Sequence, residues 1–130
     1  MSGLNKVMLI GNLGKDPEMR YTPDGTPVTS FSLAVSRTWV NNDGERREAT
    51  EWFNVVAWRR LAEICSQYLR KGERVYVEGR LQTRSWEDQD GQKHFRTEVV
   101  AQDMLLLSQR PMRPEEESLS TEPGPEEEGF

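Results

Sequence analysis

Cysteine, histidine and long apolar runs are scarce in this chain of 130 residues. Its one cysteine, Cys65, cannot form an internal disulfide, and one Cys with one His gives too few ligands for a Cys/His zinc site. No run approaches the roughly 18 apolar residues of a membrane helix, and the N-terminus lacks the pattern of a secretory signal. We therefore expect a cytoplasmic protein that needs no metal, no cofactor and no membrane.

Basic residues are absent from residue 114 onward. Residues 1–113 hold all 17 Lys and Arg against 15 acids, whereas residues 114–130 hold seven Glu. The net charge of -5 therefore combines a mildly basic body with an acidic tail. Because the local field matters more than the net charge, a polyanionic partner such as a nucleic acid is not excluded.

Apolar residues are also rare in the tail. Residues 111–130 contain only Met112, Leu119 and Phe130, together with four prolines. Such a segment cannot bury enough surface to offset its ordering entropy. We therefore expect a folded domain over residues 1–110 and a disordered acidic tail over residues 111–130.

Period-two alternation predicts five strands in the folded part. They lie at residues 4–11, 31–39, 48–58, 74–86 and 93–107. The first is apolar on both faces, Met8 and Ile10 included, so we expect partial burial of both faces. The turn signals Asn42-Asp43-Gly44 and Asp90-Gly91 join the second strand to the third and the fourth to the fifth.

A helix separates the third and fourth strands. Apolar residues recur there at helical spacing, at Leu61, Ile64, Cys65, Tyr68 and Leu69. Arg70, Lys71 and Gly72 are interpreted as its basic last turn and stop, Cys65 as a small core residue, and Gly79 as a bulge or tight bend. The predicted fold class is all-β, a five-stranded Greek-key OB-fold barrel with one helix between strands three and four.

Tryptophans and arginines interleave along the strands. The tryptophans are Trp39, Trp52, Trp58 and Trp86, and the neighbouring arginines are Arg37, Arg46, Arg47, Arg59, Arg60, Arg80 and Arg84. Aromatic rings stack on unpaired bases and cations neutralise phosphates, whereas a duplex hides its base faces. An isolated tryptophan is more often a core residue. Trp86, however, alternates in register with arginines, which predicts exposure.

The faces of the third strand are less clearly distinguished. Trp52 and Trp58 share one face, opposite Phe53 and Val55, and both faces are apolar enough to be buried.

Four motifs carry a family resemblance: Asn5-Lys6-Val7, the stretch 11–21, Thr50-Glu51-Trp52 and the stretch 68–72. Over residues 1 to about 108 the chain closely resembles bacterial single-stranded DNA-binding proteins. The resemblance implies a homotetramer of OB-folds, associated with the nucleoid. It also implies binding of single-stranded DNA without strong sequence preference, during DNA replication, recombination and repair. The four tryptophans would stack on bases, although position 58 is commonly Phe in that family.

The end of the chain resembles the same family. Members carry an acidic tip ending in Pro-Phe that docks replication and repair proteins. Here Gly129 replaces the proline, and glutamates replace the usual aspartates. The resemblance implies that partner proteins bind Glu126, Glu127, Glu128 and Phe130, whereas composition alone favours a solubilising tail.

Three alternatives stay open at this point. The barrel could bind RNA, or its surface could serve mainly to contact proteins in replication restart. A metal nuclease could be built on Glu87, Asp88 and Asp90, although acids around an Asp-Gly hairpin are more often turn formers. His94, in the same hairpin, is interpreted as solvated or phosphate-facing. We favour a binding protein that is not an enzyme.

Overall fold

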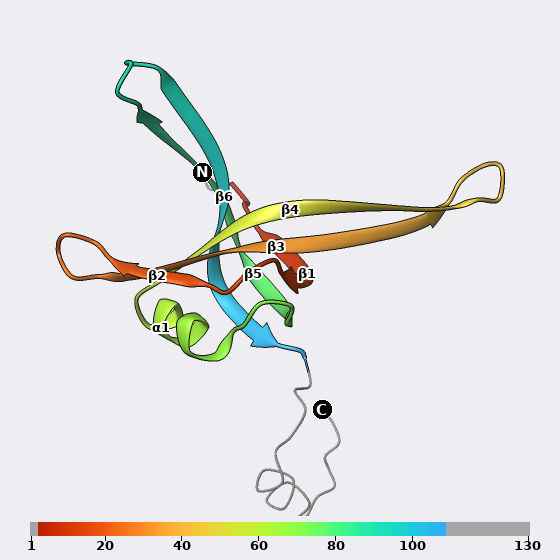
Figure 1. Ribbon diagram of the computed structural model, residues 1–130, viewed down its shortest axis with the longest axis horizontal. Helices are drawn as coiled ribbons and strands as arrows, with labels where there is room; N and C mark the ends of the chain where they lie inside the picture. The colour runs from red at the N-terminus through yellow and green to blue at the C-terminus, as the bar shows by residue number, and fades with distance from the viewer. Residues whose placement is uncertain (1–2, 109–130) are drawn as a thin grey trace, which may run out of the picture.

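The computed structural model describes residues 3–108 (Figure 1). Within them, one helix and six strands follow one another in the order β1 (Val7–Leu13), β2 (Glu18–Tyr21), β3 (Pro27–Val40), β4 (Arg46–Trp58), α1 (Arg59–Tyr68), β5 (Arg74–Glu87) and β6 (Lys93–Leu106). The helices of this described part include none long and apolar enough to cross a membrane. The predicted domain end at residue 110 and the predicted tail at 111–130 lie outside the described residues.

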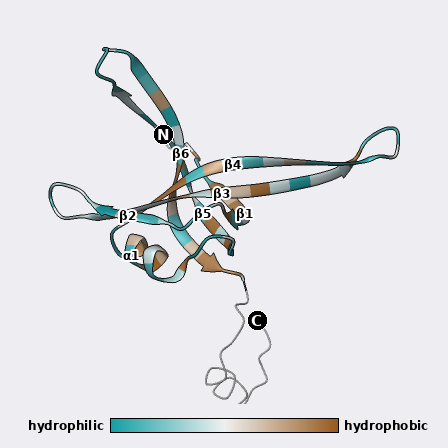
Figure 2. Ribbon diagram, viewed as in Figure 1, coloured by the Kyte–Doolittle hydropathy of each residue, from teal (hydrophilic) through white to brown (hydrophobic). Residues whose placement is uncertain are grey.

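Five of the strands close into a barrel. The sheet order is β1-β5-β6-β4-β3-β2, and β1 also pairs with β3, which closes the ring. All pairings are antiparallel except β4 with β6. The predicted barrel and the predicted position of its helix are confirmed. Figure 2 shows the apolar residues concentrated on the barrel, whereas the ends of the two long hairpins are mostly hydrophilic.

The short strand β2 was not among the predicted strands. All four of its residues are exposed, so the short alternation in Glu18-Met19-Arg20-Tyr21 corresponds to no buried face. Backbone pairing with β3 holds it, from Glu18 opposite Ser30 to Tyr21 opposite Pro27.

Two glycines let backbones approach within the barrel. At Gly11 a Cβ would collide with the carbonyl oxygen of Ala34, next to the pairs Asn12–Ala34 and Leu13–Leu33 that join β1 to β3. At Gly79 a Cβ would collide with the carbonyl oxygen of Val100. The β5–β6 register shifts between Glu78 and Gly79, so the predicted bulge is confirmed.

The core lies inside the barrel and under the helix. Its fully buried members include Leu33, Val55, Val75 and Cys65. Burial raises the pKa of the Cys65 thiol to about 12, which keeps it protonated and confirms the core assignment. The hydroxyl of Thr29 donates to the carbonyl oxygen of Ala62 at 2.7 Å, tying α1 to β3.

Two details of the prediction were wrong. Met8 and Ile10 are 63% and 45% exposed, so β1 buries only one face within a single chain. The helix ends at Tyr68, because Leu69 leaves helical geometry (φ -95°, ψ 145°) and its side chain is fully buried. The basic residues 70–71 therefore belong to the turn after the helix, where Gly72 has a φ of 87°.

Replacing Gly11 with Ala should destabilise the protein by about 1–3 kcal/mol, because the new methyl group would push β1 away from β3. Urea and thermal unfolding of the full chain measure the change. Gly3→Ala is the matched control, because a Cβ there meets nothing within 4 Å. Equal stability of the two variants would contradict the closure role of Gly11.

Candidate nucleic-acid interface

The outer face of β3 and β4 carries two of the tryptophans. Trp52 and Trp58 are 60% and 39% exposed, while Val55 and Ala57 on the opposite face are fully buried. The structure therefore distinguishes the two faces that the sequence pattern left open, and the tryptophan side chains lie on the exposed one. A Cβ at Gly14 would collide with the Trp52 indole, so the absence of a side chain there makes room for the ring.

The β5–β6 hairpin carries the third tryptophan, Trp86. Trp86 is 41% exposed, which confirms the predicted exposure. The guanidinium carbon of Arg84 lies 5.1 Å from the centroid of its ring, and the His94 ring stacks on it at 5.5 Å. Arg84 Nη2 also lies 3.2 Å from Glu98 Oε2. Glu98 is only 7% exposed, so the pair fixes a cation at the surface above a buried carboxylate.

A cavity of about 440 Å³ lies between β2, β3, β4 and the β5–β6 hairpin. Trp58 and Arg84 from the predicted set line it together with three further cations, Lys15, Arg20 and Arg96. Polar groups on its wall include Ser30, Ser32, Asn54 and Gln82, and the acids Glu18 and Glu98 also border it. The cavity can therefore accept a polar anionic ligand beside an aromatic ring.

A second cavity, of about 460 Å³, shares Trp58 and Gln82 with the first. It brings in Arg59 and Arg80. Arg59 has a φ of 60°, a left-handed conformation that is costly for a residue with a side chain. This conformation lies at the junction where β4 turns directly into α1. Two of the predicted arginines thus lie beside a predicted tryptophan.

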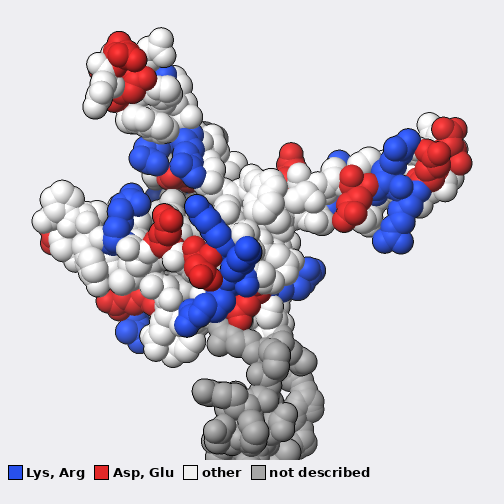
Figure 3. Space-filling view, in the orientation of Figure 1, with Lys and Arg blue, Asp and Glu red and all other residues white. Residues whose placement is uncertain are grey.

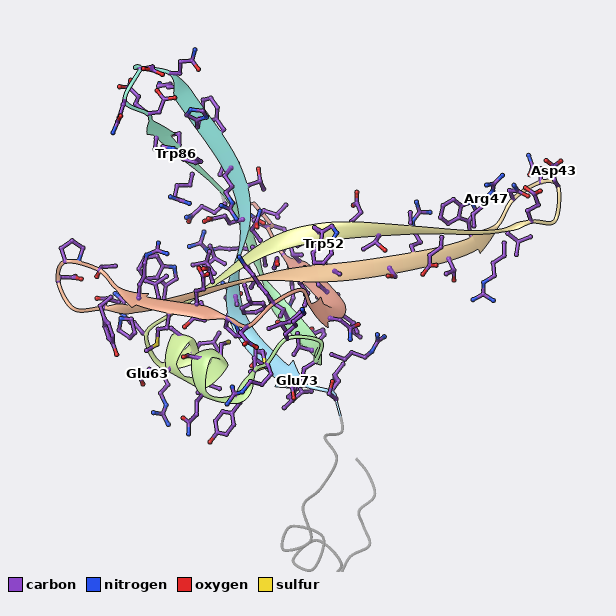
Figure 4. All side chains as sticks on the ribbon, viewed as in Figure 1. Asp43, Arg47, Trp52, Glu63, Glu73 and Trp86 are labelled. Atoms are coloured by element: carbon purple, nitrogen blue, oxygen red, sulfur yellow. The ribbon has the colours of Figure 1, made fainter. Side chains whose placement is uncertain are left out.

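The outer part of the β3–β4 hairpin is an arm that projects from the barrel, with Arg47 near its end (Figures 1 and 4). Its four predicted residues, which line neither cavity, are Arg37, Trp39, Arg46 and Arg47. The guanidinium carbon of Arg37 lies 4.4 Å from the Trp39 ring centroid. Strand alternation places Trp39 on the opposite face of the hairpin from Trp52.

The remaining predicted arginine lies elsewhere. Arg60, on α1, has an 84% exposed side chain 3.8 Å from Glu63, and it lines neither cavity. The structure does not bring it to the other predicted residues.

Three cations of the first cavity were missed from the sequence. Arg96 is the register partner of Arg84, a relation between two strands that spacing within the last predicted strand does not reveal. Lys15 lies in the turn after β1, and Arg20 lies on β2, a strand of four exposed residues too short to predict a face.

Charges of both signs lie on the visible face of the molecule, with acids among the cations of the central body. Figure 3 shows Lys and Arg gathered over the central body and in a band on each hairpin, with acids at both hairpin tips. At one tip Asp88 Oδ1 accepts hydrogen bonds from the backbone N–H groups of Asp90 and Gln92, as expected of a turn former. The part of the chain that the structure describes contains no cluster of three or more His, Cys, Asp or Glu side chains that could hold a metal ion.

Comparison with known proteins gives consistent matches. Residues 4–107 match the Single-strand binding protein family. Over 106 residues the chain is 57% identical to single-stranded DNA-binding protein 1 of Chlorobaculum tepidum, a match covering 81% of this chain and 65% of that protein, less than two thirds of its length.

Solved structures of similar fold agree. A Plasmodium falciparum SSB in complex with ssDNA has a TM-score of 0.77 and 35% identity, covering 83% of this chain and 98% of that chain. A deletion mutant of the single-stranded DNA binding protein from Thermus aquaticus has a TM-score of 0.73 and 37% identity, covering 83% of this chain and 52% of that one. The resemblance seen in the sequence motifs is confirmed, and the interpretation as a binding protein rather than an enzyme agrees with it. The chain belongs to the Single-strand binding protein family.

Proposed function

We propose that the protein binds single-stranded DNA without strong sequence preference and shields it from re-pairing and nucleases during replication, recombination and repair. The proposed stacking residues are Trp39, Trp52, Trp58 and Trp86. The observation that carries the proposal is the exposure of all four indoles together with two adjoining cavities that are lined by arginines and share Trp58. A location on the nucleoid follows from this role.

The chemistry of the interface favours single strands over a duplex. An exposed indole offers a π-face to an unpaired base, and arginines beside it neutralise the phosphates of the same strand. The proposed phosphate contacts are Arg37, Arg46, Arg47, Arg59, Arg60, Arg80 and Arg84, to which the first cavity adds Lys15, Arg20 and Arg96. Stacking tolerates any base, which accounts for weak sequence preference.

Oligothymidine should quench the tryptophan fluorescence strongly, with an affinity that falls as salt rises. Trp52→Ala should weaken binding by about 1–3 kcal/mol with the melting temperature unchanged, because one stacked base is lost. Tyr68→Ala is a control, since Tyr68 is an exposed aromatic residue on α1 and lines neither cavity.

Two outcomes would count against this proposal. A lower melting temperature with unchanged DNA affinity in Trp52→Ala would make Trp52 a structural residue. Tighter binding of a matched RNA oligomer would make RNA the preferred ligand.

We further propose that the protein assembles as a homotetramer. On the outer face of the β1-β5-β6 sheet, Ile10 lies opposite Tyr76, and Tyr76 opposite Leu105. Met8, Ile10 and Leu105 are 63%, 45% and 59% exposed in the single chain. Apolar groups that share a sheet face are favourably covered by a second copy of the chain.

Ile10→Lys should shift the assembly to smaller species, because it places a charge in the proposed interface. Size-exclusion chromatography with light scattering measures the mass, and circular dichroism checks the fold. Val40→Lys serves as a control, because Val40 is 67% exposed on the β3–β4 arm. An Ile10→Lys variant with the parent's mass would contradict the proposed interface.

We also propose that the acidic tip recruits replication and repair proteins. Its residues Glu126, Glu127, Glu128 and Phe130 lie outside the described part of the chain. A terminal aromatic residue offers an apolar anchor and a carboxylate, and the glutamates add long-range attraction to a basic pocket.

Deleting Phe130 alone should abolish capture of such partners without changing DNA affinity. Pull-downs from a bacterial lysate, with the partners identified by mass spectrometry, compare the intact and shortened chains. Deletion after Arg113 should leave DNA affinity equal or higher, most visibly at low salt, because the removed glutamates repel phosphates. Recovery of the same replication and repair proteins by both chains would reduce the tail to a solubilising segment.

A further inference from the structure

Trp86 and His94 form a ring pair near the end of the β5–β6 hairpin, where Figure 4 labels Trp86. The two residues are register partners on neighbouring strands. Their rings stack with centroids 5.5 Å apart and planes 20° apart. Trp86 remains 41% exposed, so the pair leaves part of the indole open to a ligand. Cross-strand contact of this kind stabilises the arrangement of both side chains.

Asp88 holds the imidazole of that pair. His94 Nε2 lies 2.8 Å from Asp88 Oδ2, and because a carboxylate can only accept hydrogen bonds, Nε2 is the donor. Asp88 Oδ1 accepts from the backbone N–H groups of Asp90 and Gln92, both at 2.9 Å. The pKa of the Asp88 carboxyl lies below its ordinary value, first because of the hydrogen bond from His94 and then because of that from Gln92. The acceptor is therefore ionised at neutral pH.

These contacts form a continuous support for the indole. The turn backbone fixes Asp88, Asp88 fixes His94, and His94 covers part of the Trp86 ring. A free side chain loses rotamer entropy when a ligand immobilises it, and this loss weakens binding. An indole that is already held loses less, so the support favours stacking without touching the ligand.

We propose that His94 is a positioning residue for base stacking, which together with Asp88 holds the Trp86 indole ready for a nucleotide. This role rests on the proposed binding of single-stranded DNA. It differs from a phosphate contact in one measurable respect. A cation that neutralises a phosphate steepens the salt dependence of binding, whereas a residue that only holds a ring does not.

The test uses the full chain with Trp39, Trp52 and Trp58 replaced by Phe, so that Trp86 is the only tryptophan. Fluorescence anisotropy of the DNA-free protein then reports how firmly that indole is held. Titration with oligothymidine at several salt concentrations reports affinity and salt slope. Circular dichroism shows whether each variant is folded.

Three variants in this background separate the contribution of the stacked ring from that of the hydrogen bond to Asp88. His94→Ala removes the ring, His94→Phe keeps a flat ring without the hydrogen bond, and Asp88→Asn removes the carboxylate. Asn keeps an amide oxygen that can accept from the turn N–H groups. Lys93→Ala is the matched control, because it removes a cation from the adjacent position, whose side chain alternates to the other face of β6.

We expect His94→Ala to lower the anisotropy of Trp86 and to weaken oligothymidine binding about two- to tenfold, with an unchanged salt slope. His94→Phe should restore most of that affinity, because stacking is retained. The anisotropy and the oligothymidine affinity of Asp88→Asn should lie between those of the parent and those of His94→Ala.

Several results would overturn the proposal. Parent values of anisotropy and affinity in His94→Ala would remove the support role. A shallower salt slope in His94→Ala, or equal weakening by Lys93→Ala, would assign the effect to charge instead. The unsubstituted chain, with all four tryptophans, is titrated alongside, and its failure to bind oligothymidine would overturn the proposed function, and this role of His94 with it. Binding by the parent with unaffected His94 variants would overturn the positioning role alone.

Discussion

Closure of the barrel at β1 and β3 is the constraint on which the rest of the structure depends. The two strands meet through only two register pairs, Asn12–Ala34 and Leu13–Leu33. The two backbones can approach closely enough to pair because Gly11 presents no side chain to the carbonyl oxygen of Ala34. Once the ring is closed, one face of every barrel strand must point inward. The opposite face of each strand therefore contacts solvent or a partner.

The arrangement of the interface follows from this division. Trp52 and Trp58 point outward because their neighbours Val55 and Ala57 fill the core. On the β5–β6 hairpin, the same alternation places Arg84 and Trp86 on one face. Buried Glu98 then pairs with Arg84. Six cations thus line the two cavities although the net charge of the chain is negative.

Much of this arrangement could be predicted from the sequence. Alternation identified the five barrel strands and their hairpin turns, because the barrel part of each strand is buried on one side. The arginines in register with Trp86 indicated its exposure. β2 was not predicted from the sequence, because its four residues are all exposed and only backbone pairing defines it. The contribution of Arg96 and the contact of His94 with Trp86 depend on the register between strands. Sequence spacing within one strand does not contain that information.

The β3–β4 arm differs from the barrel in how its backbone is stabilised. From Ser36 to Trp52 none of its residues is buried, so cross-strand hydrogen bonds and side-chain pairs alone hold it together. A two-stranded ribbon without a core is only marginally stable in water, so its local opening costs far less free energy than global unfolding. Amide hydrogens in the arm will therefore exchange faster than those of the barrel. Within residues 3–108, a trace of protease will cut the arm before the barrel, leaving the barrel folded.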